Sequence, residues 1–524
     1  MPSSTDPREN PVRDGSTAAD DASGADGQQW VDPLRWKALL VIAIAQMMVV
    51  LDASIVNLAL PSAKTALGIS DADQQWIVTA YTLAFGGFLL LGGRIADYVG
   101  RKRVFIIGLI GFAAASALGG IAPTAAFLFG ARALQGGFAA LLAPAALSLI
   151  TVTFHVPKER ARAFGVYGAI AGGGAAIGLL LGGVLTEYLS WRWCLLVNTP
   201  IAIFAAILAI PFVRESRATD RSNYDIGGAV TVTAGLVALV YGFTKAAPHG
   251  FTDVSHWTEG STLAWLAFAV VMLVLFFVIE NRVSNPLLPM RVLLNRNRGG
   301  SYLVALIVGI GLFAMFLFLG LYLQVVLGYS PIRAGFAFLP FSIGIILGAG
   351  VASQLLPRVG PKPLMVPGLL AGAVGMVLLA QLKSDSQYFS HVLPAMIIIS
   401  LGMAFTFIPV STTALHGIGH EDAGVGSAVI NTSQQVGGAV GTALLNTVAV
   451  AATTAYLSAN TDQGKAALAV ALTEGYTRAF LVGSVFLVVA AILTVTMITI
   501  GKDAAKEDDD EDDGKINAPA VHVG

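Results

Sequence analysis

Long apolar segments separated by short polar ones occupy most of the chain. A helix that crosses the ~30 Å hydrocarbon layer needs about 20 apolar residues. Segments close to this length lie near 38–60, 74–96, 104–122, 125–152, 163–186, 194–213, 226–244, 262–280, 300–326, 334–356, 363–382, 391–413, 425–453 and 478–500. The pattern therefore predicts an all-α, polytopic membrane protein with 14 transmembrane helices.

The composition agrees with this class of protein. Of the 524 residues, 55% are hydrophobic and only 12% are charged, far from the balance of soluble domains. The single cysteine, Cys194, excludes a disulfide framework, and the few histidines form no zinc-like group with it. We expect no metal, no cofactor and no nucleic-acid partner. No nucleophile–base pair or nucleotide-binding loop occurs in a long polar stretch, so an enzyme is not expected.

The two ends of the chain are polar and lack periodicity. Residues 1–34 and 501–524 are predicted to be disordered tails, the second because it contains EDDDEDD at 507–513. An even number of spans places both tails on one side of the membrane. With the N-terminus in the cytoplasm, the inner loops hold most of the Lys and Arg residues, as the positive-inside rule requires. We therefore expect a multi-pass protein of the cell membrane with both termini cytoplasmic.

The spans divide into two runs of six. Residues 35–215 and 299–500 each hold six predicted helices, and 216–298 holds two extra linking helices and a cytoplasmic loop. Transporters built from such repeats bind substrate at the interface of the halves, near the middle of the membrane. A channel is disfavoured because no selectivity-filter string or ring of charges is present.

Asp52 is the most informative single residue, because it lies inside the first apolar helix. A carboxylate there costs about 2.5–3.5 kcal/mol on insertion scales, so it predicts a functional site. Asp52 lies nine residues before Pro61, or about 13 Å from the outer helix end, and Arg132 lies about 11–12 Å into the fourth helix. The two can meet at one depth, with Gln135 and Gln46 as further partners of the guanidinium. The pair is either a permanent ion pair that only holds helices together or a proton-responsive pair.

The loop GGRIADYVGRKR (92–103) follows the second helix. Gly93 is predicted to permit close helix approach and Gly100 to permit the turn, with Asp97, Arg101 and Lys102 in a charge cluster at the membrane face. The spacing resembles the signature loop of the major facilitator superfamily. The resemblance implies a latch between the two halves on the cytoplasmic side, with Asp97 facing the start of the helix near residue 425.

Further motifs resemble the fourteen-helix drug:proton antiporter branch of that superfamily. They are LDASIVNLALP (51–61), ARALQGGFAALLAP (131–144), WRWCLLVNTP (191–200), LYLQVVLGYSPIRAG (321–335) and GSAVINTSQQVGGAVG (426–441). The resemblance covers roughly residues 35–500 and implies the major facilitator fold in a 6 + 2 + 6 arrangement. It implies a proton-coupled antiporter that exports lipophilic drugs or antibiotics by alternating access, with Asp52 as the proton carrier and Arg132 as its partner.

Polar and aromatic residues of the predicted helices are candidate contacts of a substrate. They are Gln46, Asn57, Gln135, Asn198, Phe316, Tyr322, Gln324, Asn431, Gln434 and Gln435. The amides either line the cavity or bond between helices. The aromatic side chains, with Phe313, Phe318, Phe336 and Phe338, either line it or are packed elsewhere. Because Asp225 and Glu280 fall at helix ends, Asp52 is expected to be the only acid of the cavity. This favours a small lipophilic substrate that is neutral, monocationic or zwitterionic.

Glycines of the fifth helix recur at four-residue spacing. Gly174, Gly178 and Gly182 are predicted to let two helices pack closely. The antiporter branch usually has Gly-Pro in this stretch, thought to fix the transport direction, whereas Gly178 is followed by Leu179 here.

Two other functions stay open at this stage. One is a facilitator or importer of a defined small metabolite, and the other is a non-transporting membrane sensor. The expected partners of the favoured exporter are a small lipophilic substrate, protons and the lipid bilayer, and we expect a monomer.

Overall fold

The structure is a computed structural model of the chain. It describes residues 33–70, 73–154, 157–217, 225–246, 259–283, 286–418, 423–460 and 464–501, so the two predicted tails lie almost wholly outside the described residues. Within these ranges the secondary structure is helical and contains no strand.

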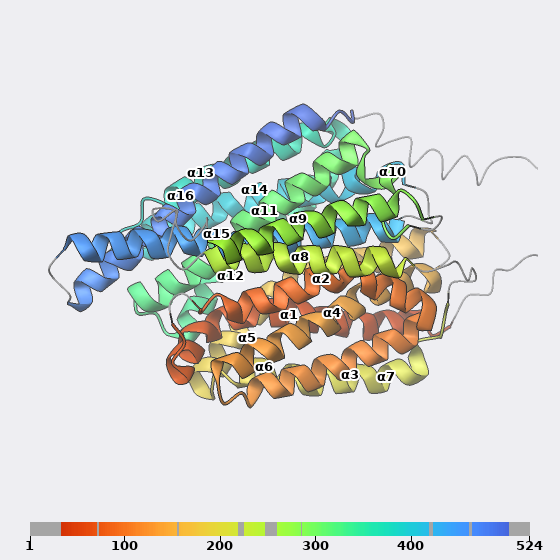
Figure 1. Ribbon diagram of the computed structural model, residues 1–524, viewed down its shortest axis with the longest axis horizontal. Coiled ribbons are helices and arrows are strands. Elements are labelled where there is room, and N and C mark those ends of the chain that lie inside the picture. Colours follow the sequence, from red (N-terminus) through yellow and green to blue (C-terminus); the bar gives the residue numbers. More distant parts are fainter. Residues whose placement is uncertain are drawn as a thin grey trace, which may run out of the picture.

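The first half of the chain forms an N-terminal bundle of antiparallel helices (Figure 1). Its members are α1 (Arg35–Leu67), α2 (Trp76–Val99), α3 (Arg101–Gly120), α4 (Ala125–Thr153), α5 (Pro157–Tyr188), the single turn α6 (Trp193–Leu196) and α7 (Asn198–Phe212). Two linking helices follow, α8 (Ile226–Ala246) and α9 (Gly260–Glu280), and then the short α10 (Met290–Leu293).

The second half forms a C-terminal bundle of similar build. Its members are α11 (Arg296–Leu321) with the π-helical turn η2 (Tyr322–Val326), α12 (Pro331–Val359), α13 (Lys362–Leu379), the turn η3 (Tyr388–Val392) with α14 (Leu393–Leu415), α15 (Ala423–Ala459) and α16 (Lys465–Met497).

Twelve helices are long and apolar enough to cross a membrane, counted over the described part of the chain. The protein is therefore a multi-pass membrane protein. Each of the fourteen predicted segments coincides with a helix, and in α2 and α5 the described residues include the shorter apolar stretches Trp76–Leu89 and Ile177–Tyr188. The total of fourteen spans is therefore not confirmed.

The two bundles repeat one packing scheme. In the first, α1 packs on α5 and α7, while α4 packs on α2 and α3. In the second, α11 packs on α15 and α16, while α14 packs on α12 and α13. The repeat extends to side chains, since α5 packs on α1 through glycines and α15 packs on α11 through Gly437 and Gly441. The halves are therefore related by an internal pseudo-symmetry, as expected of repeat-built transporters.

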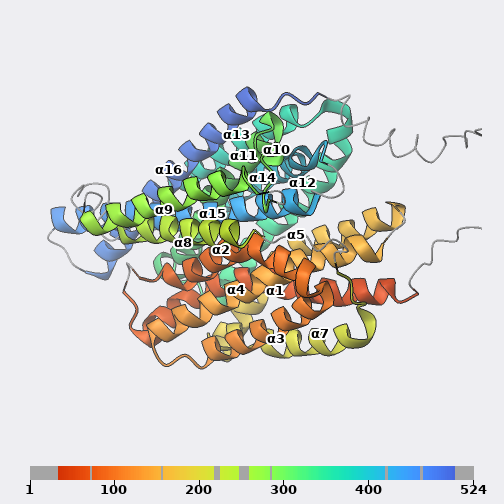
Figure 2. The ribbon, with the colours of Figure 1, turned by 45° about the vertical axis from the view of Figure 1, so that its right-hand side comes forward.

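Contacts between the bundles follow the same symmetry. Helix α5 packs on α12, and α2 packs on α15, so that each bundle offers its second and fifth helices to the other. At the α5–α12 crossing, a Cβ placed on Gly183 would lie 2.7 Å from Ile332 Cα. Helices α8 and α9 lie along the boundary of the bundles in both views (Figures 1 and 2), where α8 contacts α2 and α15.

Candidate functional site

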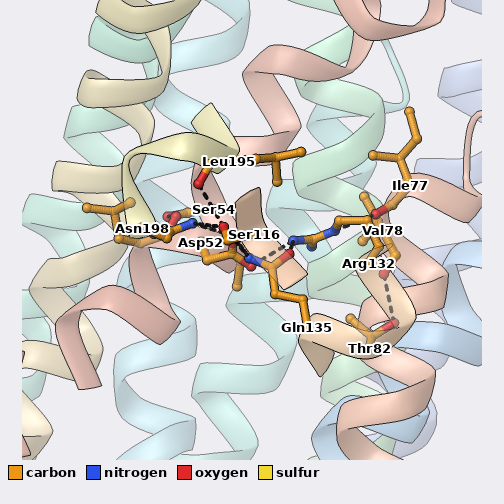
Figure 3. Close-up of polar contacts among 12 residues, drawn as sticks. Asp52, Ser54, Ile77, Val78, Thr82, Ser116, Arg132, Gln135, Leu195 and Asn198 are labelled. Carbon is orange, nitrogen blue, oxygen red and sulfur yellow. Dashed lines mark hydrogen bonds and ion pairs between the residues drawn. The ribbon is translucent and has the colours of Figure 1, made fainter. Parts of the chain in front are cut away.

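Asp52 lies inside the N-terminal bundle and is fully buried, and Arg132 of α4 lies beside it (Figure 3). The distance from Arg132 Nη1 to Asp52 Oδ2 is 2.7 Å. The meeting of these two side chains, expected from their depths, is observed. Four helices of one bundle supply the site: α1 with Asp52, α3 with Ser116, α4 with Arg132 and Gln135, and α7 with Asn198.

Three donors surround the Asp52 carboxylate. Arg132 donates to Oδ2, while Gln135 Nε2 and Asn198 Nδ2 both donate to Oδ1, each at 2.7 Å. An ionised carboxylate is a pure acceptor, so all three contacts suit the charged form of Asp52. The buried charge is thereby paired and hydrogen-bonded, as burial requires.

Arg132 is held by more than its salt bridge. Its Nε donates to the Ile77 carbonyl at 3.0 Å, and Nη1 also donates to Gln135 Oε1 at 2.7 Å. The guanidinium carbon lies 4.4 Å from the centre of the Tyr81 ring, close enough for a cation–π contact. These contacts depend on close approach of α2 and α4, because a Cβ on Gly136 would lie 2.2 Å from the Tyr81 carbonyl oxygen.

Ser116 joins the polar groups from the third helix. Its hydroxyl donates to the Leu195 carbonyl at 2.7 Å and accepts from Gln135 Nε2 at 3.0 Å. Sequence reasoning missed Ser116, although a hydroxyl in the run AAASALGG near the outer end of an apolar helix was a usable signal. Asn198 is the first residue of α7 and donates to Asp52 from this position.

The network can accommodate a second protonation state of Asp52. Adding a proton turns one carboxyl oxygen into a donor, which needs an acceptor that the three present contacts do not provide. Asn198 Oδ1 is buried without a hydrogen-bond partner beside that oxygen, since its amide nitrogen donates to Asp52 Oδ1. Rotation of the Asn198 amide would offer this acceptor to a protonated Asp52.

Several predicted substrate contacts are engaged elsewhere. Gln46 accepts from the Tyr167 hydroxyl at 2.7 Å and not from Arg132, so its expected pairing with the guanidinium is wrong. Asn57, Gln324 and Asn431 donate to carbonyls three or four residues back in their own helices. Such local bonds satisfy a polar side chain within an apolar helix.

The aromatic candidates do not gather around one cavity. Phe316 packs on Phe338 within the C-terminal bundle. Tyr322 is fully buried and donates its hydroxyl to the Lys383 carbonyl at 2.6 Å. Phe318 stacks on Tyr476, and Phe336 is 57% exposed on the outside of its helix. Of the two alternatives, these positions favour packing elsewhere, because most of these rings fill helix–helix contacts.

One candidate amide, Gln435, lies at the boundary between the bundles. A Cβ on Gly86 of α2 would lie 3.0 Å from Gln435 Cβ, and Gln435 Oε1 is buried without a partner. The backbone of Gln434 instead faces α11 within the C-terminal bundle, where a Cβ on Gly309 would meet the Gln434 carbonyl oxygen at 2.5 Å. Gln435 is therefore the candidate with an unused hydrogen-bond acceptor at the α2–α15 crossing.

The loop after α2 is anchored within its own bundle. The Lys102 amide donates to Glu215 Oε1 at 3.1 Å, and the Lys102 ammonium group donates to the Ile210 carbonyl at 2.6 Å. The Arg101 amide donates to the Ser216 carbonyl at 3.0 Å. Gly100 has φ +118°, so the predicted need for glycine at the turn is confirmed. The side chain of Asp97, the acid expected to face α15, lies outside the described residues.

Close approach of helices at this loop depends on Gly92 and not on Gly93. A Cβ on Gly92 would lie 2.1 Å from the Ala140 carbonyl oxygen, whereas a Cβ on Gly93 would make an ordinary 3.5 Å contact with Pro144. The expectation for Gly93 was wrong because adjacent residues differ by about 100° around a helix.

The glycines of α5 lie against α1, next to Asp52. A Cβ on Gly174 would lie 3.0 Å from Val50, one on Gly178 2.0 Å from Ser54 Oγ, and one on Gly182 2.8 Å from Ile55. The observed contacts agree with the packing role expected for these three residues.

Two acids expected outside the interior are buried. Asp225 is 7% exposed and Glu280 is 3% exposed, although both stand at helix ends as the sequence indicated. Here the segment after Pro286 and the end of α2 cover them.

An apolar groove of about 730 Å³ lies between α2, α3 and α4. Its walls include Phe88, Phe127, Leu134 and Phe138, but not Asp52 or Arg132. Leu134 and Phe127 are 52% and 41% exposed, so the groove opens on the outer surface of the bundle. It is therefore distinct from the polar network.

The sequence was compared with protein-family models and with known proteins, and the matches agree with the fold of two helical bundles. The family model of the Major Facilitator Superfamily matches residues 42–442. A puromycin resistance protein of Streptomyces alboniger is 49% identical over 91% of this chain and 94% of its own length. A cephamycin export protein of Amycolatopsis lactamdurans is 37% identical, with 89% and 93% covered.

Solved structures show the same fold at low identity. A bacterial homologue of the human lysosomal transporter Spinster has a TM-score of 0.62 and 17% identity, covering 91% of this chain and 98% of that one. A nucleoside transporter has a TM-score of 0.58 and 12% identity, with 89% and 100% covered. Family match, helical repeat and buried ion pair together show that the chain belongs to the major facilitator superfamily, and that it is a transporter and not an enzyme.

Proposed function

We propose that the protein exports lipophilic antibiotics across the cell membrane in exchange for protons. The observation that carries the proposal is the buried Asp52, surrounded by three donors and paired with Arg132. Burial disfavours the charged carboxylate and the guanidinium favours it, so a helix movement that changes either contribution makes Asp52 bind or release a proton. Asp52 is then the proton carrier.

The relatives indicate the class of cargo. Proteins named for puromycin resistance and cephamycin export share 49% and 37% of their aligned residues with this chain over most of its length. In this exporter we assign substrate contact to the bundle boundary near Gln435, whose Oε1 has no partner. Puromycin is the natural first probe because the more similar of these relatives is named for it.

Alternating access has a structural counterpart in the contacts of α5. Its C-terminal half packs tightly on α12 at Gly183, and Glu187 Oε2 accepts the Ile332 amide at 2.9 Å. Both contacts lie at the end of the bundles opposite to the start of α5, where Glu159 pairs with Arg35. We assign the end with Gly183 and Glu187 to the outside. The end with Glu159 and Arg35, and both termini, are assigned to the cytoplasm. The Arg35 hydrogen bond is the main cause that holds the pKa of Glu159 below its usual value, so this pair stays ionised in the cytoplasm.

The proposal includes membrane passage of all fourteen long helices, α2 and α5 among them. Helices α2 and α5 have 24 and 32 residues, more than the ~20 that cross the hydrocarbon layer. We further propose that the protein acts as a monomer and needs no cofactor besides the proton gradient.

The test is uptake of radiolabelled puromycin into everted vesicles with an imposed pH gradient. We expect wild-type protein to transport against the substrate gradient, and Asp52→Asn to abolish coupled transport. The asparagine keeps an acceptor for Arg132, so the variant still folds. Protein amount in the membrane and thermal unfolding check this second point.

Asp385→Asn is the matched control, because Asp385 is an exposed acid in the loop before η3. It should transport as the wild type does. Coupled transport that persists in Asp52→Asn would exclude Asp52 as the carrier. Transport in both proteins that ignores the pH gradient would instead support a facilitator.

A further inference from the structure

Four charged side chains are buried among the residues that the structure describes: Asp52, Arg132, Asp225 and Glu280. The first two form the salt bridge of the functional site. The other two are both acids and lie together on the linking helices, Asp225 directly before α8 and Glu280 at the end of α9. We call Asp225 and Glu280 the linker carboxyl pair.

One oxygen of each acid has an ordinary structural role. Asp225 Oδ1 accepts the Gly228 amide at 2.6 Å, which caps the first turn of α8. Glu280 Oε2 accepts the Leu288 amide at 3.1 Å and so holds the segment after α9. Leu287 and Leu288 of this segment are buried in the core of the protein.

The two remaining oxygens face each other. The Glu280 and Asp225 side chains lie within hydrogen-bonding reach. A Cβ on Gly228 would lie 2.2 Å from Asp225 Oδ2 and 2.8 Å from Glu280 Oε1, so both oxygens converge over this glycine. Neither oxygen has a hydrogen-bond partner when both acids are treated as acceptors.

Two ionised carboxylates cannot satisfy this geometry. Each would be an acceptor without a donor, and their like charges would repel at contact distance in a buried place. One proton between the oxygens removes both penalties, because it makes one acid a donor and leaves a single negative charge. Such a pair titrates as a unit.

Within the described ranges, which leave out residues 218–224, one cation is found that acts on this pair. Arg94 of α2 acts electrostatically on Glu280 and donates to the Pro286 carbonyl. Helix α15, which packs on α8, carries no charged residue from Ala423 to Ala459, and the segment Pro286–Pro289 is apolar. One arginine against two carboxyl groups matches a pair that holds one proton.

We propose that the linker carboxyl pair is a second proton-binding site, separate from Asp52, which locks the base of the α8–α9 hairpin to the end of α2. With the proton bound, Asp225, Glu280, the Pro286–Leu288 segment and Arg94 form one connected unit. Loss of the proton leaves two facing carboxylates and releases that connection. The site does not depend on the proposed antiport.

The decisive test is infrared spectroscopy of purified Asp52→Asn protein, in which the carboxyl group of the functional site is absent. We expect a carbonyl band of a protonated carboxylic acid at neutral pH, and its loss on adding Glu280→Gln or Asp225→Asn. Each amide can donate to the remaining carboxylate, so both variants keep the hydrogen bond without a titrating proton. If one variant fails to fold, the other still decides.

Thermal unfolding of the wild-type protein gives an independent readout. Its midpoint should fall as the pH rises, because removal of the shared proton leaves two repelling carboxylates, whereas Glu280→Gln should lose this part of the pH dependence. Asp385→Asn, an exposed acid, is the control and should leave both band and pH dependence unchanged. A band that survives in both Glu280→Gln and Asp225→Asn, or an unchanged pH dependence in both, would overturn the proposal.

Discussion

At the scale of single residues, the site around Asp52 shows how a charge is tolerated in a membrane protein. Arg132 uses its fork of donors in three directions, toward Asp52, Gln135 and the Ile77 carbonyl. A lysine could not match this geometry, because its ammonium group is a compact point charge on a flexible stem. The pair is best understood as two residues that depend on each other, so its energetics must be tested in combination.

Loss of Arg132 alone should be far more damaging than loss of the whole pair. Arg132→Gln leaves the buried Asp52 carboxylate without a cation, and breaking such a pair costs about 3–5 kcal/mol. The double variant Asp52→Asn/Arg132→Gln removes both charges and should recover most of this stability, but not transport. Denaturation of the purified proteins and uptake into vesicles measure the two effects. Strictly additive losses in the double variant would show that the charges are not coupled.

At the scale of helices, glycines determine how closely the elements approach. On α5, three successive glycines face α1, and Gly183 faces the backbone of α12 in the other bundle. One helix thus packs within its bundle and across the boundary, with glycine in both contacts. Small residues in such positions allow helices in a membrane to gain packing energy from close contact.

Gly183→Ala should therefore weaken the outer contact between the bundles. Its Cβ would lie 2.7 Å from Ile332 Cα and from the Pro331 carbonyl oxygen, so the backbone must shift. Overpacking of this kind costs about 1–3 kcal/mol, and we expect several-fold slower transport as the closed outer end becomes less stable. Gly130→Ala is the control, since nothing lies within 4 Å of the added Cβ. Equal transport rates in the two variants would exclude a role for this contact.

Much of the helical pattern and part of the site could be predicted from the sequence. Hydropathy located the segments, and helix rise placed Asp52 and Arg132 at one depth. Hydropathy does not determine which neighbour a helical residue faces. The sequence therefore predicted close helix approach at Gly93, whereas Gly92 makes this contact. Burial of Asp225 and Glu280 could not be foreseen, because it depends on contacts between distant parts of the chain. Arg94 is far in sequence from both acids, and residues 286–288 are far from Asp225.

At the scale of the whole molecule, similar halves carry different chemistry. Both bundles repeat the same helix contacts, yet the buried salt bridge among the described residues lies in the first bundle alone. Helices α8 and α9 lie at the boundary and hold the other buried acids. In the proposed mechanism, a proton at Asp52 can act on the second bundle through α1 itself, which contacts α11 and α12, through the α5–α12 and α2–α15 contacts, or through the substrate.

In the proposed mechanism, a single carrier acid sets a limit on the energy available for each exported molecule. A single proton contributes about 2.3 kcal/mol per 100 mV and about 1.4 kcal/mol per pH unit, which together sustain about a 500-fold gradient of a neutral substrate. One proton exchanged for one monovalent cation moves no net charge. Only the pH contribution then remains, or about tenfold per unit.

This difference predicts how transport responds to membrane potential in proteoliposomes. An imposed potential should raise the accumulation of a neutral probe by about 50-fold per 100 mV, because each exchange moves one positive charge. Accumulation of a permanently monocationic probe should not respond, while both probes should follow an imposed pH gradient. Potassium diffusion potentials set with valinomycin provide the measurement, and Asp52→Asn liposomes provide the baseline. Accumulation of the cationic probe that rises with the potential would require more than one proton in each cycle, and Asp52 could then not be the sole carrier.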